Sequence, residues 1–235
     1  MAKQKVLMVL AHPDDEVILG WPVLQDPSFD KEILICSSDR NNPARKKYAH
    51  RREALAAMCE FFKFPYTCLD YDSEFFRTPH RRKRKRGLQA LFPCGVGQGP
   101  LLGDIAATIL DAISQRTFDC IFTHNFWGEY GHLDHLLLNS LIVNNCSAPV
   151  LLTDIRLSLD WVPLGVANGY SGMLEPYSRV RACLDLPFYE QCAAFYKKSK
   201  TWTWSQPPVI ETNLYHVHTR AAVAGPENKK DCETQ

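Results

Sequence analysis

Residues 5–11, Lys-Val-Leu-Met-Val-Leu-Ala, form an almost unbroken apolar run near the start of the chain. Such a run predicts a strand buried on both faces, because a strand with one solvated face would alternate apolar and polar residues. Residues 31–38, Lys-Glu-Ile-Leu-Ile-Cys-Ser-Ser, repeat the pattern. Strands of this kind occur in parallel sheets that are covered by helices on both sides.

Helix and strand patterns then alternate along the first two-thirds of the chain. We expect a helix within residues 16–27 that starts just after the acids and stops before Pro27, and further helices over residues 43–63, 101–115 and 132–145. Further strands are expected over residues 66–71, 118–123 and 148–155. This order predicts an α/β fold, a Rossmann-like three-layer sandwich with a mostly parallel sheet.

Prolines and glycines interrupt the pattern after about residue 156. A helix near residues 187–196 and a late strand within residues 209–219 follow. We expect a single domain over residues 1–225, with a core over about residues 4–155 and an irregular extension over about residues 156–225. The residues after it, 226–235, have the composition of a disordered tail.

The charge of the chain is unevenly distributed. Its 235 residues carry a net charge of +1, and removing the six positive charges of residues 81–86 (Arg-Arg-Lys-Arg-Lys-Arg) leaves −5. An acidic chain with one basic run does not fit a nucleic-acid-binding fold. The run is interpreted as a solvated loop, with attraction of a phosphate, a nucleotide-sugar or an anionic membrane, or nuclear import, as alternatives.

Several features favour a cytoplasmic protein. No apolar stretch reaches the roughly 18 residues of a membrane-spanning helix, and the first apolar run is too short for a signal peptide. The nine cysteines are odd in number, scattered and without a Cys-x-x-Cys pair, which is typical of reduced, buried thiols. Whether the protein forms an oligomer stays open.

Two polar clusters follow predicted strands. His-Pro-Asp-Asp-Glu occupies residues 12–16, and residues 123–135 hold three histidines and two acids. Ligands of open parallel sheets bind at the carboxyl ends of the strands, so both clusters are expected to face one site. Two imidazoles and one carboxylate, from His12, Asp15 and His135, would suit a hydrolytic zinc ion. Asp14 would then be placed to take a proton from water as a general base.

Each cluster also has a structural interpretation. The three acids could stabilise the N-terminus of a helix, and the residues His-Leu-Asp-His at 132–135 could be a polar helix start with His132 as the cap and His135 exposed. The occurrence of both clusters at strand ends favours the metal site.

The two motifs, Ala-His-Pro-Asp-Asp-Glu at 11–16 and Gly-Glu-Tyr-Gly-His-Leu-Asp-His at 128–135, resemble those of the PIG-L/LmbE-type zinc-dependent N-deacetylases. That family acts on molecules containing N-acetylglucosamine. The resemblance implies an LmbE-like fold and hydrolysis of a linear amide C–N bond. It also implies a Zn²⁺ ion on His12, Asp15 and His135, with Asp14 as base, His132 as acid or oxyanion stabiliser and Asp134 orienting a histidine.

Substrate contacts are less well defined by the sequence. Family members often carry a sugar-binding arginine near the start of the second helix, and Arg51 or Arg52 could be that residue, with His50 as an alternative. Asp39 and Arg40 lie on the expected rim of the site. Trp202 and Trp204 are interpreted as core residues, with stacking on a sugar as the alternative.

The sequence therefore predicts a zinc hydrolase that deacetylates an N-acetylated amino sugar, either a small molecule or one linked to a lipid or a nucleotide. Two alternatives remain. One is hydrolysis of another amide or ester at the same site, and the other is a catalytically silent sugar-binding protein. The complete set of His12, Asp14, Asp15, His132 and His135 favours the enzyme.

Overall fold

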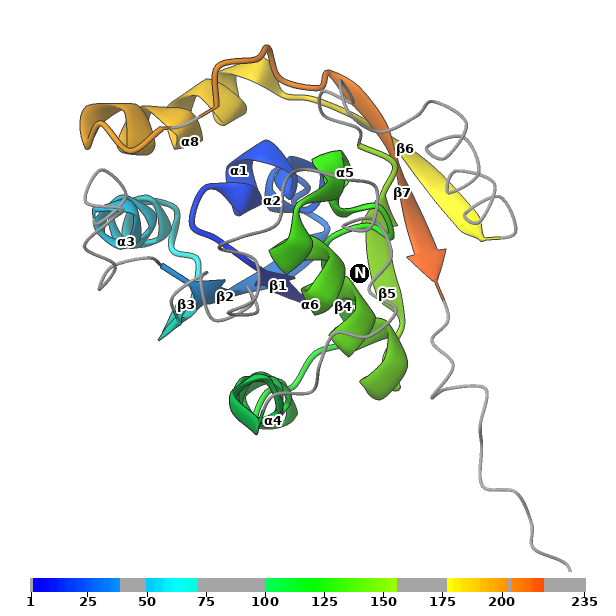
Figure 1. Cartoon of the computed structure of the whole chain (residues 1–235). Helices are drawn as coiled ribbons and strands as arrows, with labels where there is room; N and C mark the ends of the chain where they lie inside the picture. Colours follow the sequence, from blue (N-terminus) through cyan, green and yellow to red (C-terminus); the bar gives the residue numbers. More distant parts are fainter. Residues whose placement is uncertain (1, 39–49, 72–99, 156–176, 203, 218–235) are drawn as a thin grey trace, which may run out of the picture.

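A seven-stranded sheet organises the computed structural model (Figure 1), which describes residues 2–38, 50–71, 100–155, 177–202 and 204–217. The spatial order of the strands is β3-β2-β1-β4-β5-β7-β6. Their bounds are Gln4–Leu10 for β1, Phe29–Ser37 for β2, Tyr66–Tyr71 for β3, Cys120–Phe122 for β4, Val150–Thr153 for β5, Ser178–Cys183 for β6 and Glu211–Val217 for β7.

The sheet is mostly parallel, as predicted. Strands β1 to β5 pair in parallel, β7 pairs antiparallel with β5, and β6 pairs antiparallel with β7. Strand β1 has β2 on one side and β4 on the other, so the strand order reverses direction beside β1. In doubly wound sheets such a reversal point is where ligands bind.

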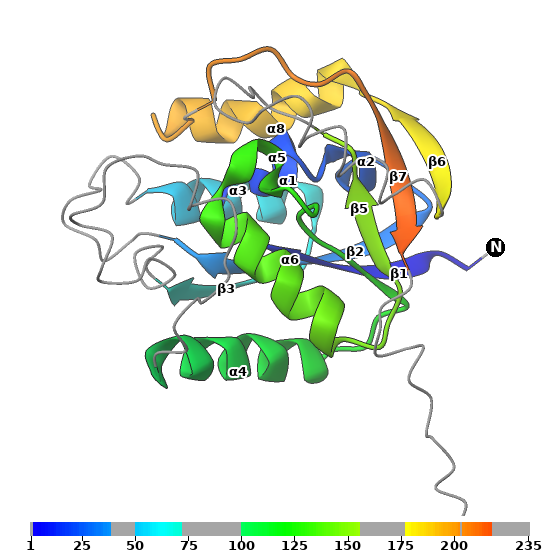
Figure 2. The ribbon, with the colours of Figure 1, turned by 45° about the vertical axis from the view of Figure 1, so that its right-hand side comes forward.

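Helices cover both faces, which confirms the three-layer arrangement (Figure 2). One face carries α1 (Asp15–Ile18), α2 (Trp21–Leu24), α3 (Arg51–Phe62) and α8 (Leu186–Lys198), and the other carries α4 (Pro100–Ser114) and α6 (Leu133–Asn145). The short helix α5 (Gly128–Gly131) precedes α6.

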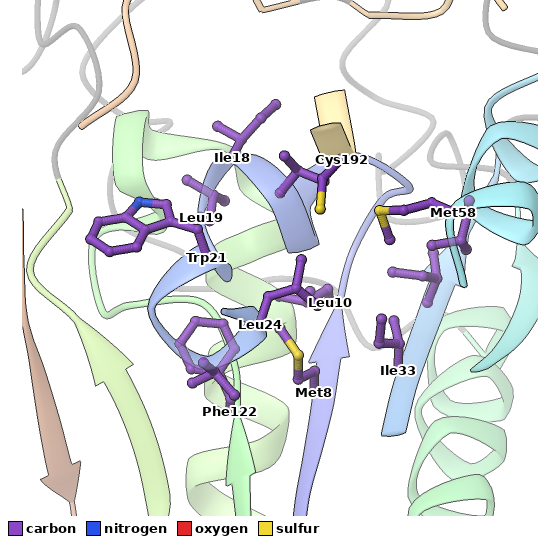
Figure 3. Packing of buried hydrophobic residues seen from close by; sticks show 14 of the residues in the cluster. Met8, Leu10, Ile18, Leu19, Trp21, Leu24, Ile33, Met58, Phe122 and Cys192 are labelled. Atoms are coloured by element: carbon purple, nitrogen blue, oxygen red, sulfur yellow. The ribbon is translucent and has the colours of Figure 1, made fainter. Parts of the chain in front are cut away.

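The alternation of β1 side chains produces two hydrophobic cores. Met8 and Leu10 pack with Ile18, Met58 and Cys192 of α1, α3 and α8 (Figure 3). The intervening residues, such as Leu7 and Val9, pack against α4 and α6 on the opposite face. The unbroken apolar run at the start of the chain therefore reflects burial on both sides of the strand.

The helix predicted over residues 16–27 is wrong in detail, because the chain forms two short helices there. Gly20 separates the two helices, and neighbouring atoms leave no room there for a side chain. A Cβ atom at this position would lie 2.8 Å from the backbone oxygen of Glu16 and 2.6 Å from Cε of Met8. The close packing of this turn against β1 favours glycine and ends the first helix.

The region interpreted as an irregular extension contributes β6, α8 and β7, of which the sequence predicted the last two. Strands β6 and β7 extend the sheet beyond β5, so they belong to the same layer as the first five strands. The limits of the single domain stay a prediction, and the tail at 226–235 lies outside the described residues. So do residues 43–49 of the second predicted helix and the basic run at 81–86.

Two further sequence expectations can be compared with the described residues. The seven cysteines among them are all free thiols. None of the helices in the described ranges combines the length and the apolar character needed to cross a bilayer.

Candidate active site

The two polar clusters meet where adjacent strands β1 and β4 end. Met8 pairs with Phe122 in the parallel register, so the chain leaves both strands at the same edge of the sheet. Nε2 of His12 lies 2.9 Å from Oδ2 of Asp134, across 122 positions of sequence. The expectation that both clusters face one site is confirmed.

The turn after β1 is held in an unusual backbone conformation. Asp14 has φ 99° and ψ −19°, in the left-handed region, which costs a non-glycine residue about 1–3 kcal/mol. Its N–H donates to Oε2 of Glu16 at 3.0 Å, and the hydroxyl of Tyr196 in α8 donates to the other oxygen of Glu16. Asp14 occupies the N-cap position of α1 but makes no side-chain capping bond, which argues against a purely capping role for this carboxylate.

The carboxylate of Asp15 contacts both His12 and His135. Oδ2 of Asp15 lies 3.4 Å from Nδ1 of His12 and 3.5 Å from Nε2 of His135. Nε2 of His12 contacts Asp134, and Nδ1 is the nitrogen of His12 that faces Asp15. All three residues are buried, so the structural alternative of an exposed His135 is wrong.

The site has the charge and the unpaired atoms that a cation would satisfy. Among the described residues, Nε2 of His135 and Oδ1 of Asp134 are buried without a hydrogen-bond partner. Buried carboxylates gather around them, and buried charges in proteins are paired or bind metals. These carboxylates are Asp14, Asp15, Glu129 and Asp134.

The same carboxylates shift the proton affinity of the histidines. Burial alone would lower the pKa of His12, but contacts with Asp134 and Asp15 raise it to about 9. For His135, interactions with Asp15 and Glu129 outweigh burial and raise the pKa to about 10. In return, the charges of His135 and His12 hold the pKa of Asp15 well below its usual range despite burial. The buried carboxylates therefore stabilise a positive charge on the imidazoles of His12 and His135.

Two overlapping groups of side chains could hold a metal ion. One consists of His12, His132 and His135, and the other of Asp15, His124 and His135. His135 is common to both. The triad predicted from the sequence takes His12 from the first group and Asp15 from the second.

The neighbouring arginines of α3 point to different places. Nη2 of Arg51 lies 2.9 Å from Oδ2 of Asp14, and both side chains are buried. Arg52 instead pairs with Asp70 of β3, outside the cluster. The structure thus brings Arg51 to the site and not Arg52. Asp39 and Arg40 lie outside the described residues.

His132 both caps a helix and lies against two histidines of the site. Its Nδ1 accepts the N–H of Asp134 at 3.3 Å, so it caps α6 as the structural alternative predicted. Its ring also lies 4.9 Å from that of His12 and 4.5 Å from that of His135, measured between centroids. Its side chain is 20% exposed, which makes it the most accessible imidazole of the cluster.

The two tryptophans differ in their surroundings. Trp202 is partly buried and packs against the hydrophobic core beside Tyr189 and Tyr196, with ring centroids 6.2 and 6.1 Å away. Trp204 lies 6.2 Å from Tyr130, whose ring is in turn 5.5 Å from those of His132 and His135.

Sequence reasoning gave no role to His124, Glu129 or Tyr130. His124 lies two residues after the end of β4 and is buried, and its Nδ1 lies 3.3 Å from Oε2 of Glu129. Although burial opposes it, the charges of His124 and His135 lower the pKa of Glu129 to about 2. The sequence did offer one signal, because His124 is a further histidine within residues 123–135. Its contact with Glu129 depends on a bend in the chain, which residue spacing alone does not reveal.

Sequence comparison does not assign the chain to a family. No protein-family profile matches the chain. Uncharacterized protein L374 of Acanthamoeba polyphaga mimivirus is 24% identical over 149 residues, which span 60% of this chain and 57% of the relative. The match therefore covers little more than half of that protein.

Two solved deacetylase structures overlap most of the chain. A deacetylase of teicoplanin biosynthesis, solved as a complex with teicoplanin, has a TM-score of 0.57 at 15% identity, covering 92% of this chain and 99% of the other. The A40926 pseudoaglycone deacetylase Dbv21 has a TM-score of 0.56 at 13% identity, covering 92% and 97%. This chain shares their LmbE-like fold. At these identities the likeness establishes the architecture alone.

Proposed function

We propose that the protein is a zinc-dependent N-deacetylase that hydrolyses the acetamide of an N-acetylated amino sugar. The observation that carries this proposal is the position of the buried Asp15 carboxylate, whose Oδ2 lies near Nδ1 of buried His12 and near Nε2 of buried His135. Zinc bonds of about 2.0–2.2 Å separate the ligand atoms of a tetrahedral site by about 3.3–3.5 Å. The separations of 3.4 and 3.5 Å from Oδ2 of Asp15 fit this spacing.

These three residues would hold the ion. Zinc bound there would supply a Lewis acid for the amide carbonyl and would lower the pKa of a bound water toward ~7. Asp134 supports the arrangement, because its contact with Nε2 of His12 leaves Nδ1 for the site. A carboxylate behind a ligand histidine fixes both its tautomer and its ring orientation.

Asp14 is the candidate general base. It neighbours Asp15 in the turn and has a strained backbone, and the two carboxylates have different partners. The guanidinium of Arg51 contacts Asp14 and offsets the repulsion of the surrounding acids. Asp14 would take a proton from the attacking water and pass it on to the departing amine.

His132 would stabilise the charge that develops on the amide oxygen. It is the more exposed histidine of the cluster and lies against His12 and His135. Protonated His132 can donate a hydrogen bond where the oxyanion forms. Attack, collapse and proton transfer yield acetate and a free amine.

The choice of an amino-sugar substrate rests on the motif resemblance and is supported by two fold neighbours, the deacetylase of teicoplanin biosynthesis and the A40926 pseudoaglycone deacetylase. Sugar contacts by Arg51, Arg52, Asp39 and Arg40 remain predictions, as do the cytoplasmic location and the choice among free, lipid-linked and nucleotide-linked substrates. Hydrolysis of another amide or ester, or silent sugar binding, are the alternatives.

One experiment separates these possibilities. Purified protein is analysed for metal content and then screened for acetate release from free, inositol-linked, nucleotide-linked and lipid-linked N-acetylglucosamine. The proposal expects about one zinc per chain and acetate from at least one compound. Zinc without acetate from any of the four would favour the sugar-binding alternative, and protein that binds no zinc would contradict the proposal.

A further inference from the structure

Two stacked histidines share one carboxylate behind the candidate metal site. The rings of His124 and His135 lie nearly parallel, 12° apart, with centroids separated by 3.8 Å. Oε2 of Glu129 lies 2.7 Å from Nδ1 of His135 and 3.3 Å from Nδ1 of His124. All three side chains are buried. Both imidazoles therefore direct the same nitrogen at the same acceptor.

The opposite nitrogens differ. Nε2 of His124 accepts the backbone N–H of Ala11 at 2.9 Å, so its lone pair is already used. Nε2 of His135 has no hydrogen-bond partner among the described residues. Yet both Nε2 atoms lie 3.5 Å from Oδ2 of Asp15, so distance alone does not tell which histidine would bind a metal. The hydrogen bonds distinguish them.

Glu129 is itself held firmly in place. Its Oε1 accepts the N–H of Asn125 at 2.9 Å, and its own N–H donates to Oδ1 of Asn125 at 2.9 Å. The amide of Asn125 donates in turn to the carbonyl of Ile155 at 2.9 Å, anchoring the loop after β4 to the end of β5. Glu129 has φ 57° and ψ −50°, outside the helical region, and this bend turns its side chain back toward the histidines.

We propose that Glu129 is a positioning residue that fixes both imidazoles with the proton on Nδ1, so that His135 alone presents Nε2 to zinc. His124 is then excluded from the ligand set and acts as a rigid backing for His135. This inference rests on the proposed zinc site and adds the residue that selects between its two candidate histidines. A carboxylate with two accepting oxygens is required, because Oε2 serves two N–H donors and Oε1 serves a third.

Glu129→Gln is the sharpest variant, because it keeps the shape and replaces one oxygen by a donor. With the amide nitrogen toward the histidines, donor meets donor, and His135 is driven to the tautomer that carries its proton on Nε2. With the amide nitrogen toward Asn125, the backbone N–H there loses its acceptor. Either arrangement disturbs the network, and we expect zinc affinity to fall by about 10–100-fold.

The measurements are zinc affinity by competition with a chelator and the histidine tautomers by long-range ¹H–¹⁵N NMR of the zinc-loaded protein. The inference expects Nδ1–H signals for both His124 and His135 in the wild type and a changed pattern in Glu129→Gln. Glu129→Asp keeps both oxygens and should bind zinc more tightly than Glu129→Gln. This rescue separates positioning from a general loss of fold, and it remains informative where the glutamine variant folds poorly.

Glu32→Gln is the matched control, since the same chemical change falls on a carboxylate of β2 that pairs with Arg116. Its zinc affinity should equal that of the wild type. His124→Asn should retain one zinc per chain with an affinity within about tenfold of the wild type.

Wild-type affinity in Glu129→Gln, or an aspartate variant no better than the glutamine one, would overturn the inference while leaving the zinc site intact. Complete loss of zinc in His124→Asn would make His124 a ligand and would also overturn it. A wild-type protein that binds no zinc would remove the proposed function together with this inference.

Discussion

Nη2 of Arg51 lies 2.9 Å from Oδ2 of Asp14, whereas the adjacent Arg52 pairs with Asp70. The first pair is buried, with side chains 10% and 3% exposed, and the second is more accessible at 31% and 25%. Neighbouring arginines on one helix thus serve separate purposes, and only the first can influence the candidate base.

The two arginines provide a matched comparison. Arg51→Gln leaves a buried carboxylate without its charged partner, which we expect to lower the free energy of unfolding by about 3–5 kcal/mol. Arg52→Gln should lower it by no more than about 1 kcal/mol. Urea unfolding measures both, with acetate release as a second readout in which only Arg51→Gln is impaired. Equal effects of the two substitutions would contradict the assignment of Arg51 to the site.

The adjacent carboxylates of the first turn should separate chemistry from metal binding. Asp14→Asn removes the candidate base and should lower kcat by about 10²–10⁴-fold while one zinc stays bound. Asp15→Asn removes a ligand that faces both His12 and His135, so it should lose zinc as well as activity. Metal analysis and acetate release on the two purified variants test this. Zinc loss in Asp14→Asn would instead place Asp14 among the ligands.

Removal of zinc should destabilise the fold. The candidate ligands come from the segments that follow β1 and β4, so an ion that binds the native state links parts of the chain far apart in sequence. Free zinc at 100 times its Kd should add about 2.7 kcal/mol to the stability, and a chelator should reverse the gain. Thermal unfolding with and without added zinc measures the shift in Tm. Asp15→Asn is the control, and a similar shift in that variant would show that zinc binds elsewhere.

The sequence predicted what depends on local patterns. The apolar run before His12 indicates a strand buried on both faces, and the polar residues after it mark the edge where ligands bind. Strand β6 was missed because its residues are mostly exposed and pair only with β7 at the sheet edge, which leaves little apolar signal.

The site was only partly predictable for a related reason. Motifs identify His12, Asp15 and His135, but the pairing of Glu129 with two histidines depends on a positive φ and on the packing of the loop. Likewise, Arg51 and Arg52 have the same side chain in adjacent positions. Only the orientation of α3 against the turn after β1 distinguishes them.

Asp154 gives a prediction for the pH dependence of stability. Its carboxylate accepts hydrogen bonds from the N–H and the side-chain amide of Asn213 at 2.8 and 2.7 Å and from Thr212 at 2.5 Å, joining the end of β5 to β7. Burial opposes ionisation, but these bonds from Thr212 and Asn213 prevail and lower the pKa of Asp154 below its usual value. The unfolded chain therefore binds this proton more readily than the native protein.

A carboxyl group whose pKa is lowered by folding stabilises the native state above its unfolded pKa of about 3.9, and the contribution is lost as the pH falls toward the folded value. Asp154→Asn should thus lower the free energy of unfolding by about 1 kcal/mol at pH 7. The difference from the wild type should shrink below about pH 4, because protonation then weakens the same bonds in the wild type. Urea unfolding across this range tests the prediction, with Asp111→Asn on the exposed face of α4 as control. If the difference stays constant with pH, the ionised carboxylate of Asp154 contributes no more to the free energy of unfolding than the protonated carboxyl group does.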